Sequence, residues 1–370
     1  MTRRNKTACV AFAGMYLGFL SVLAPATWAG DEPERTDSAA PANAATQDAT
    51  PEGETKDRYA VPQTQDVKEL LQFIGEVQQH RPQSAAEALE HRRKALAAIK
   101  TAAERIQQLS PDKPSEAYQA AESVLLQIRI SSAINAPAAE QQRMVDEIGK
   151  RLEDAPENRM NAALAFSLAR VLEYSSNTEV AEQANRRFGE LLAKQADPQL
   201  SQLGQTLIAT SRRLGLVGNE MELTGTTMEG TPFDWKQYRG RVVLVDFWAT
   251  WCGPCLAEMP NVRKNYDMYH DRGFDVVGVS VDDDREALGK FLQENPLPWT
   301  TLHESEGGHP AASYYGISAI PTTILVGRDG KVVSLAARGP QLTQLLEKLI
   351  GMKQEGQSTK DEGRSRKDEG

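Results

Sequence analysis

Residues 241–255 read RVVLVDFWATWCGPC, and this stretch decides the fold of the C-terminal part of the chain. Its first seven residues, 241–247, form a nearly continuous apolar run, which is typical of a strand covered on both faces of a sheet. A helical pattern follows over 253–271, so Cys252 and Cys255 lie where a buried strand gives way to a helix. The stretch therefore predicts a strand–turn–helix unit with a Cys-x-x-Cys pair at its turn.

The flanking segments extend this unit into an α/β domain. Further Val-rich strands are predicted over 274–281, 322–326 and 332–336, the last two joined by the turn signal Arg328-Asp329-Gly330. Helical patterns lie over 284–294 and 340–351. Strands and helices that alternate in this order predict a mixed sheet with helices on its faces, and we place this domain at 215–351.

Residues 61–214 have a different texture, rich in Ala, Gln, Glu, Leu and Arg and almost free of glycine. Apolar residues recur there at helical spacing, in groups that prolines separate. The region therefore predicts five to seven helices, arranged either as an irregular bundle or as a solenoid of repeats. The predicted fold class is thus a two-domain α + α/β chain, with an all-α helical domain before the α/β domain.

Three terminal segments lack the composition of a packed domain. Residues 1–29 combine a basic start (Arg3, Arg4, Lys6) with an apolar run and small residues, the pattern of a cleaved secretory signal peptide. Residues 30–60 predict a disordered linker and residues 352–370 a disordered charged tail. The expected location is therefore extracytoplasmic, in the periplasm, and the alternative is an uncleaved N-terminal membrane anchor.

Composition excludes some functions. The chain has 51 acidic and 42 basic residues and a net charge of −9. It lacks the excess of cations that general nucleic-acid binding needs, so no nucleic-acid partner is expected. Cys9 falls within the signal peptide, which leaves one close cysteine pair in the mature chain. Outside the cytoplasm, such a pair indicates redox chemistry.

The predicted chemistry rests on this pair. The start of a helix offers free N–H groups and partial positive charge that stabilise a thiolate, so Cys252 is predicted to be the nucleophile. Cys255, one turn further on, is placed to resolve a mixed disulfide, while Gly253 and Pro254 keep the turn tight. A zinc half-site would need two more ligands, and a structural disulfide across so short a loop stabilises little. We predict a redox-active Cys252–Cys255 disulfide, no other cofactor and no metal.

At these residues the chain resembles the thioredoxins, over about 216–351. The resemblance implies a thioredoxin fold, a buried Asp246 that assists proton transfer at the resolving thiol, and a cis-proline loop at Ile320-Pro321. It also implies that this loop faces the disulfide, that the backbone of Ile320 pairs with a bound substrate chain, and that Trp251 shields the site. The expected substrate contacts are thus Trp251, Gly253, Pro254, Ile320 and Pro321. Apolar neighbours independently favour burial of Asp246, which raises the pKa of a carboxyl toward neutrality.

Three longer stretches indicate which group of thioredoxin-like proteins the chain resembles: CLAEMPNV, FDVVGVSVDDDREALGKFLQENP and IPTTILVGRDGKVV. They resemble the extracytoplasmic thiol-disulfide oxidoreductases of the TlpA/ResA type, which are related to the AhpC/TSA redoxins. This implies a reductase acting on disulfide-containing client proteins, with cytochrome c maturation as one client pathway. It also implies an electron-donating thiol partner, for which a membrane-bound transporter is one form. Asp246 is a departure, because many members of the group carry a neutral residue there.

Two other functions stay open at this point. A peroxiredoxin-like peroxidase resembles Pro-x-x-x-Thr-x-x-Cys around its cysteine, whereas Ala249 stands three residues before Cys252 here. Alternatively, residues 61–214 are a protein-binding module and the redox domain is an accessory.

Two polar clusters are interpreted as structural. Asp282-Asp283-Asp284 is expected to cap the next helix rather than bind a cation. His303, Glu304, Glu306 and His309 are expected to lie in a mobile polar loop rather than line a metal site or a substrate groove.

Overall fold

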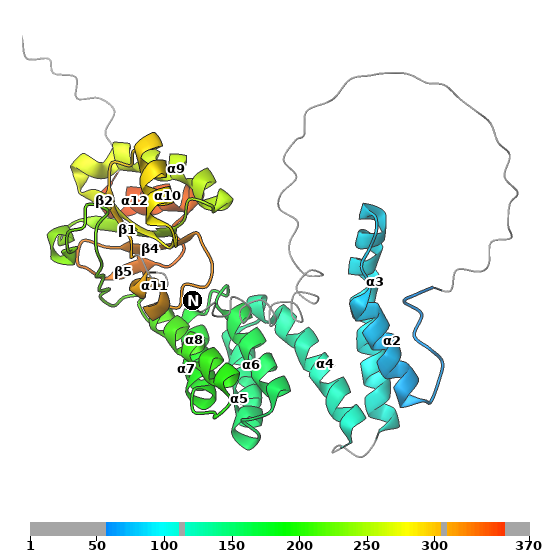
Figure 1. Cartoon of the computed structure of the whole chain (residues 1–370). Coiled ribbons are helices and arrows are strands. Elements are labelled where there is room, and N and C mark those ends of the chain that lie inside the picture. Colours follow the sequence, from blue (N-terminus) through cyan, green and yellow to red (C-terminus); the bar gives the residue numbers. More distant parts are fainter. Residues whose placement is uncertain (1–56, 111–114, 305–308, 352–370) are drawn as a thin grey trace, which may run out of the picture. The chain divides into compact units, whose positions relative to one another are not determined.

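The computed structural model describes residues 57–110, 115–304 and 309–351. These residues form two compact units that divide between Ile134 and Asn135 (Figure 1). The predicted signal peptide (1–29), nearly all of the predicted linker (30–60) and the predicted tail (352–370) lie outside the described residues. None of the described helices is long and apolar enough to cross a membrane.

The first unit is built from three helices: α2 (Val67–Gln79), α3 (Ala85–Leu109) and α4 (Glu116–Ser132). Each begins after a residue whose side chain accepts a hydrogen bond from a backbone N–H of the first turn, namely Asp66, Ser84 and Ser115. Their apolar stripes meet in one core that includes Leu70, Val77, Ile99 and Ile106. A short 3-10 turn, η1 (Ala133–Asn135), follows α4.

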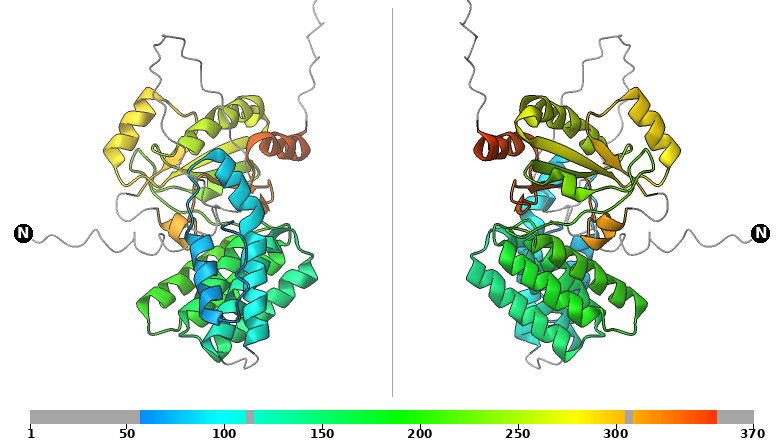
Figure 2. Two further views of the ribbon diagram at one scale, coloured as in Figure 1. Left: turned by 90° about the vertical axis from the view of Figure 1, so that its right-hand side faces the viewer. Right: turned by 90° about the vertical axis from the view of Figure 1, so that its left-hand side faces the viewer.

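The second unit starts with four helices that pack on one another: α5 (Ala138–Asp154), α6 (Arg159–Leu172), α7 (Thr178–Leu192) and α8 (Pro198–Leu214). Figures 1 and 2 show these green helices as a bundle. The backbones of α7 and α8 approach closely at Gly189 and Gly204, where a side chain would meet the opposite main chain. Larger apolar residues are fully buried on the neighbouring helices, namely Leu164 and Leu168 on α6 and Phe188 and Leu192 on α7.

The unit continues into a five-stranded sheet of order β3-β2-β1-β4-β5. The strands are β1 (Val242–Trp248), β2 (Phe274–Ser280), β3 (Thr300–Leu302), β4 (Thr322–Val326) and β5 (Val332–Ser334). The first three are parallel, while β4 runs antiparallel to β1 and to β5. The central strand β1 is buried along its whole length, as its apolar sequence predicts.

Helices cover the sheet (Figure 2). Alternate residues of β1 point to opposite faces. Val242 and Leu244 pack with α9 (Gly253–Tyr269) and α12 (Gly339–Ile350), whereas Val243, Val245 and Phe247 pack with α11 (Pro310–Tyr314) and the segment after α8. α10 (Arg285–Glu294) contributes Leu288 to a third cluster, around the cysteines. Two 3-10 turns complete the domain, η2 (Trp235–Tyr238) and η3 (His270–Arg272).

The predicted fold class is confirmed: a helical N-terminal region precedes an α/β sheet domain. β3 and α11 are not predicted from the sequence, because three and five residues are too few to show a period. The division between Ile134 and Asn135 falls inside the predicted helical domain, 61–214. Helices α5–α8 thus share a compact unit with the sheet.

Candidate active site

The two cysteines are joined as a disulfide at the start of α9. Cys252 is the N-cap residue, and its Sγ accepts a hydrogen bond from the backbone N–H of Cys255 at 3.2 Å. This donor is one of the N–H groups that a helix start leaves unpaired, so the sulfur of Cys252 lies where negative charge is favoured. Both cysteines are buried, while Gly253 and Pro254 between them are exposed.

The two tryptophans of the motif occupy different environments. Trp248 is fully buried, belongs to the cluster around the cysteines and packs on Phe291 with ring centroids 5.6 Å apart. Trp251 is 69% exposed, immediately before Cys252. Its indole therefore forms an apolar surface beside the disulfide. An exposed aromatic ring next to a reactive cysteine suits contact with an approaching polypeptide.

Asp246 lies on β1, only 8% exposed, as its apolar neighbours predict. By the alternation of the strand it shares a face with Leu244 and Trp248, the side of the sheet that α9 covers. Its Oδ1 is buried without a hydrogen-bond partner. Burial is the main cause that raises the pKa of Asp246, the negative charge of Glu258 adds to the rise, and the charge of Arg338 opposes both; together they place the pKa at about 7. The carboxyl therefore exchanges a proton near neutral pH.

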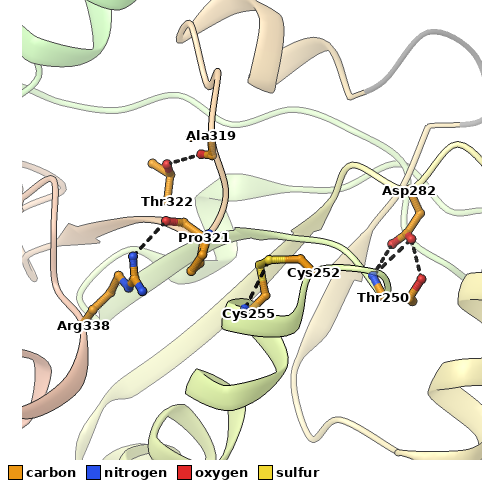
Figure 3. Close-up of a disulfide and its surroundings, with 8 residues drawn as sticks. All are labelled: Thr250, Cys252, Cys255, Asp282, Ala319, Pro321, Thr322 and Arg338. Carbon is orange, nitrogen blue, oxygen red and sulfur yellow. Dashed lines mark hydrogen bonds between the residues drawn. A yellow bond between two sulfur atoms is a disulfide. The ribbon is translucent and has the colours of Figure 1, made fainter. Parts of the chain in front are cut away.

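The loop before β4 lies next to the disulfide (Figure 3). The Ile320–Pro321 peptide bond is cis, the geometry that the resemblance implies. Ile320 packs against the cluster that contains both cysteines. The loop is tied on its C-terminal side, where Thr322 Oγ1 donates to Ala319 O at 2.7 Å and Arg338 Nη1 donates to Pro321 O at 3.2 Å. The structure thus places the loop and the Cys-x-x-Cys turn together.

A buried carboxylate anchors the active-site turn, and sequence reasoning missed it. Asp282 accepts hydrogen bonds from Thr250 N (3.1 Å) and Thr250 Oγ1 (2.6 Å), two residues before Cys252, and from Ser280 Oγ (2.8 Å). Its neighbour Asp284 is the predicted cap, accepting from the first backbone N–H groups of α10. The expectation that the aspartates serve only as caps is therefore wrong for Asp282. Its position directly after a buried strand is the available sequence signal.

The histidines near β3 are also not solvated. His303 and His309 are both fully buried. His303 Nε2 donates to Asp282 O at 2.9 Å, and His309 Nδ1 accepts from the N–H of Ala311 at 3.1 Å, which caps α11. Burial lowers the pKa of His309 to about 4, so its ring is neutral. Glu306 lies outside the described residues, among which no cluster of histidine, cysteine or acidic residues is arranged to hold a metal ion.

Comparison with known proteins reaches the same part of the chain. The Redoxin family profile matches residues 204–344. A protein named thiol-disulfide oxidoreductase ResA, from Bacillus thuringiensis subsp. konkukian, is 30% identical over 125 residues, which are 34% of this chain and 70% of that protein. ResA of Geobacillus thermodenitrificans is 30% identical over 137 residues, 36% of this chain and 78% of its own.

Among solved structures, similarity extends to the thioredoxin domain of a thiol-disulfide oxidoreductase from Bacteroides vulgatus. The two share 31% sequence identity with a TM-score of 0.34, and the match covers 36% of this chain and 97% of that one. All of these matches lie in the C-terminal part of the chain, which carries the cysteine pair.

Proposed function

Through its C-terminal part the chain belongs to the ResA family of thiol-disulfide oxidoreductases, and we propose that it reduces disulfides of client proteins outside the cytoplasm. The observation that carries the proposal is the Cys252–Cys255 disulfide at the start of α9, in which Cys252 Sγ accepts a hydrogen bond from the backbone N–H of Cys255. A dithiol in this position has a stabilised nucleophilic thiolate and a second thiol that returns it to a disulfide.

The reaction is a pair of thiol–disulfide exchanges. In the reduced protein, the Cys252 thiolate attacks one sulfur of the client disulfide, and the second client sulfur leaves as a thiolate. Cys255, once deprotonated, attacks Cys252 Sγ, which breaks the mixed disulfide and releases as a thiolate the client sulfur that Cys252 had attacked. The client gains two electrons and two protons, and the cysteine pair becomes the disulfide seen here. An electron-donating thiol partner must return the two electrons before the next cycle.

Asp246 is the proposed proton acceptor for Cys255. It lies on the face of β1 that α9 covers, with an oxygen free of hydrogen bonds. Since burial holds its pKa at about 7, the carboxyl takes up and releases a proton with little free-energy cost near neutral pH. The resolving step is therefore assigned to the pair Cys255 and Asp246.

Client binding is assigned to the surface around the disulfide. Exposed Trp251 supplies an apolar contact, and Gly253 and Pro254 leave the approach to the sulfurs uncrowded. The backbone of Ile320, before the cis-proline, is the proposed partner for an extended client segment. Main-chain hydrogen bonds recognise any extended polypeptide, which suits an enzyme with several clients.

The location rests on residues 1–29, whose basic, apolar and small-residue segments form the signal pattern. We propose cleavage near Ala29 and a periplasmic mature protein. N-terminal sequencing of the protein recovered from the periplasmic fraction tests this. A protein that keeps residues 1–29 in the membrane fraction would support the anchored alternative.

The direction of electron flow is tested by the reduction potential of the cysteine pair, equilibrated against dithiothreitol or glutathione. A value at or below roughly −220 mV is expected for a reductase, whereas a value above about −150 mV would overturn this direction and indicate a disulfide-forming oxidant. The exchange itself is tested with Cys255→Ser, which is expected to accumulate mixed disulfides with clients. Cys252→Ser is the matched control and should form none.

A further inference from the structure

We propose that the helical bundle α5–α8 positions the client-binding loop, through a clamp of Glu173, Arg170 and Arg213. The clamp holds residues 315–318, the stretch that leads into the Ile320–Pro321 cis bond. The role of the held loop rests on the proposed function, whereas the clamp itself is a feature of the fold. Its arginines act as positioning residues and do not touch the reacting sulfurs.

Glu173 lies directly after α6 and is the centre of the clamp. Its side chain is only 6% exposed, and its two oxygens accept from different arginines, Arg170 Nη1 at 2.9 Å and Arg213 Nη2 at 2.7 Å. Arg213, near the end of α8, is itself only 12% exposed. Charge-assisted hydrogen bonds out of bulk water are screened little and fix the directions of both guanidinium groups.

Both arginines reach the loop. Arg213 Nε donates to Tyr315 O at 3.3 Å, and Arg170 Nη1 donates to Ser318 Oγ at 2.9 Å. One carboxylate therefore orients two donors that hold the loop three residues apart. Figure 1 shows α11, which leads into this loop, beside the end of α8.

Backbone packing supports the same contact. Gly316 is buried with φ +60, and a Cβ built there would lie 2.5 Å from Thr210 N on α8. Only glycine combines this backbone conformation with so close an approach. Tyr315 fixes the other side of the turn, since its hydroxyl donates to Glu222 O at 2.8 Å. The bundle and the loop are thus fitted to each other at main-chain distance.

The consequence for binding follows from the short path between the clamp and the site. Ser318 is two residues from Ile320, which packs against the cysteine cluster, and Arg338 and Thr322 secure the far side. A loop held at both ends is already ordered when an extended client segment pairs with it. If the clamp end of the loop is released, the loop backbone must lose conformational entropy when the client binds, and this loss makes binding weaker. The clamp therefore lowers the KM for polypeptide disulfides.

The test uses the full chain with Arg213→Ala and Glu173→Gln, and Arg187→Ala as the matched control. Arg187 bridges α7 to α5 through Asp146 and Glu153, so its loss removes comparable ion pairs within the bundle. With oxidised insulin as the client, we expect KM to rise roughly tenfold in both clamp variants, with kcat within about twofold. Arg187→Ala should leave KM within about twofold. An equal KM in clamp variants and control would overturn the proposal.

Amide hydrogen exchange tests whether the clamp orders the loop, and it does so independently of any activity. Exchange over residues 316–320 should accelerate by roughly tenfold in Arg213→Ala and stay unchanged in Arg187→Ala. If Arg213→Ala does not fold, Arg170→Ala removes the more exposed arm and should accelerate exchange near Ser318. Equal exchange in all variants would overturn the clamp. A wild-type protein that leaves insulin oxidised would overturn the proposed function, and the exchange experiment would still judge the clamp.

Discussion

Asp246 is a carboxyl group placed where its charge is costly. Strand β1, which carries Asp246, is buried along its whole length, and the Oδ1 atom of Asp246 has no hydrogen-bond partner. A purely structural position of this kind favours an apolar residue, because an unpaired buried charge destabilises the fold. The cost is understandable if the group must change its protonation state during the reaction.

The pH dependence of stability tests this residue. The pKa of Asp246 is about 7 in the fold, against about 4 in an unfolded chain, so the folded state keeps the extra proton between these values. The free energy of unfolding therefore falls as pH rises from 4 to 7, and the loss is complete above pH 7. Asp246→Asn cannot ionise. The oxidised variant is expected to gain about 2–4 kcal/mol over wild type at pH 8.5, relative to their difference at pH 4.

Denaturant unfolding at the two pH values measures both free energies. Since every other titrating group is shared, the difference between the two proteins isolates Asp246. The same difference at pH 4 and pH 8.5 would contradict the raised pKa.

Asp282 has the opposite character, a buried carboxylate with its partners in place. Asp282→Ala removes the acceptor of Thr250 N and Thr250 Oγ1 and leaves these donors beside the cysteine turn. We expect the free energy of unfolding to fall by about 3 kcal/mol. Asp283→Ala, at the adjacent exposed position, should change it by less than about 0.5 kcal/mol. Similar losses in the two variants, measured by denaturant unfolding, would argue against the anchor.

At the scale of elements, length decides what a sequence reveals. β1 and α9 carry apolar patterns long enough to be predicted, together with the cysteine turn between them. β3 and α11 are too short for a pattern and form because neighbouring elements hold them. The same holds within the site. Cys252, Cys255 and Asp246 lie in one continuous motif, whereas Asp282 and Glu173 act across the fold, and only tertiary contacts bring them to the turn and the loop.

The contact between α7 and α8 gives an element-scale prediction. A Cβ on Gly204 would lie 2.7 Å from Ala193 Cα and 2.8 Å from Gly189 O, so Gly204→Ala must separate the two helices. We expect a loss of about 1–3 kcal/mol in the free energy of unfolding. Gly75→Ala on α2 is the matched control, because nothing lies within 4 Å of the added atom. It should stabilise the protein by about 0.5–1 kcal/mol, since alanine favours the helix. A neutral Gly204→Ala would contradict the close approach.

At the scale of the whole molecule, the boundary between the compact units differs from the domain boundary that the sequence predicts. Texture changes near residue 215, where helical patterns give way to strands. The compact units divide instead between Ile134 and Asn135, and α8 contacts the α/β domain through Thr210, which lies against Gly316, and Arg213, which donates to Tyr315 O. A module that only selected clients would need few such contacts. The bundle is better described as part of the redox unit.

Two truncated chains test this division. A chain beginning at Asn135 keeps every contact between the bundle and the loop, and we expect cooperative unfolding and a KM for oxidised insulin within about twofold of the full chain. A chain beginning at Leu216 lacks Glu173, Thr210 and Arg213, and leaves Tyr315 O and the buried turn at Gly316 without their helical partners. Its free energy of unfolding should be lower by about 3 kcal/mol or more, and its KM should rise as in the clamp variants.

Denaturant unfolding and insulin turnover on both chains decide the outcome. If the chain from Leu216 matched the chain from Asn135 in both measurements, the bundle would be a separate module, and the boundary at 214/215 would also be the physical one.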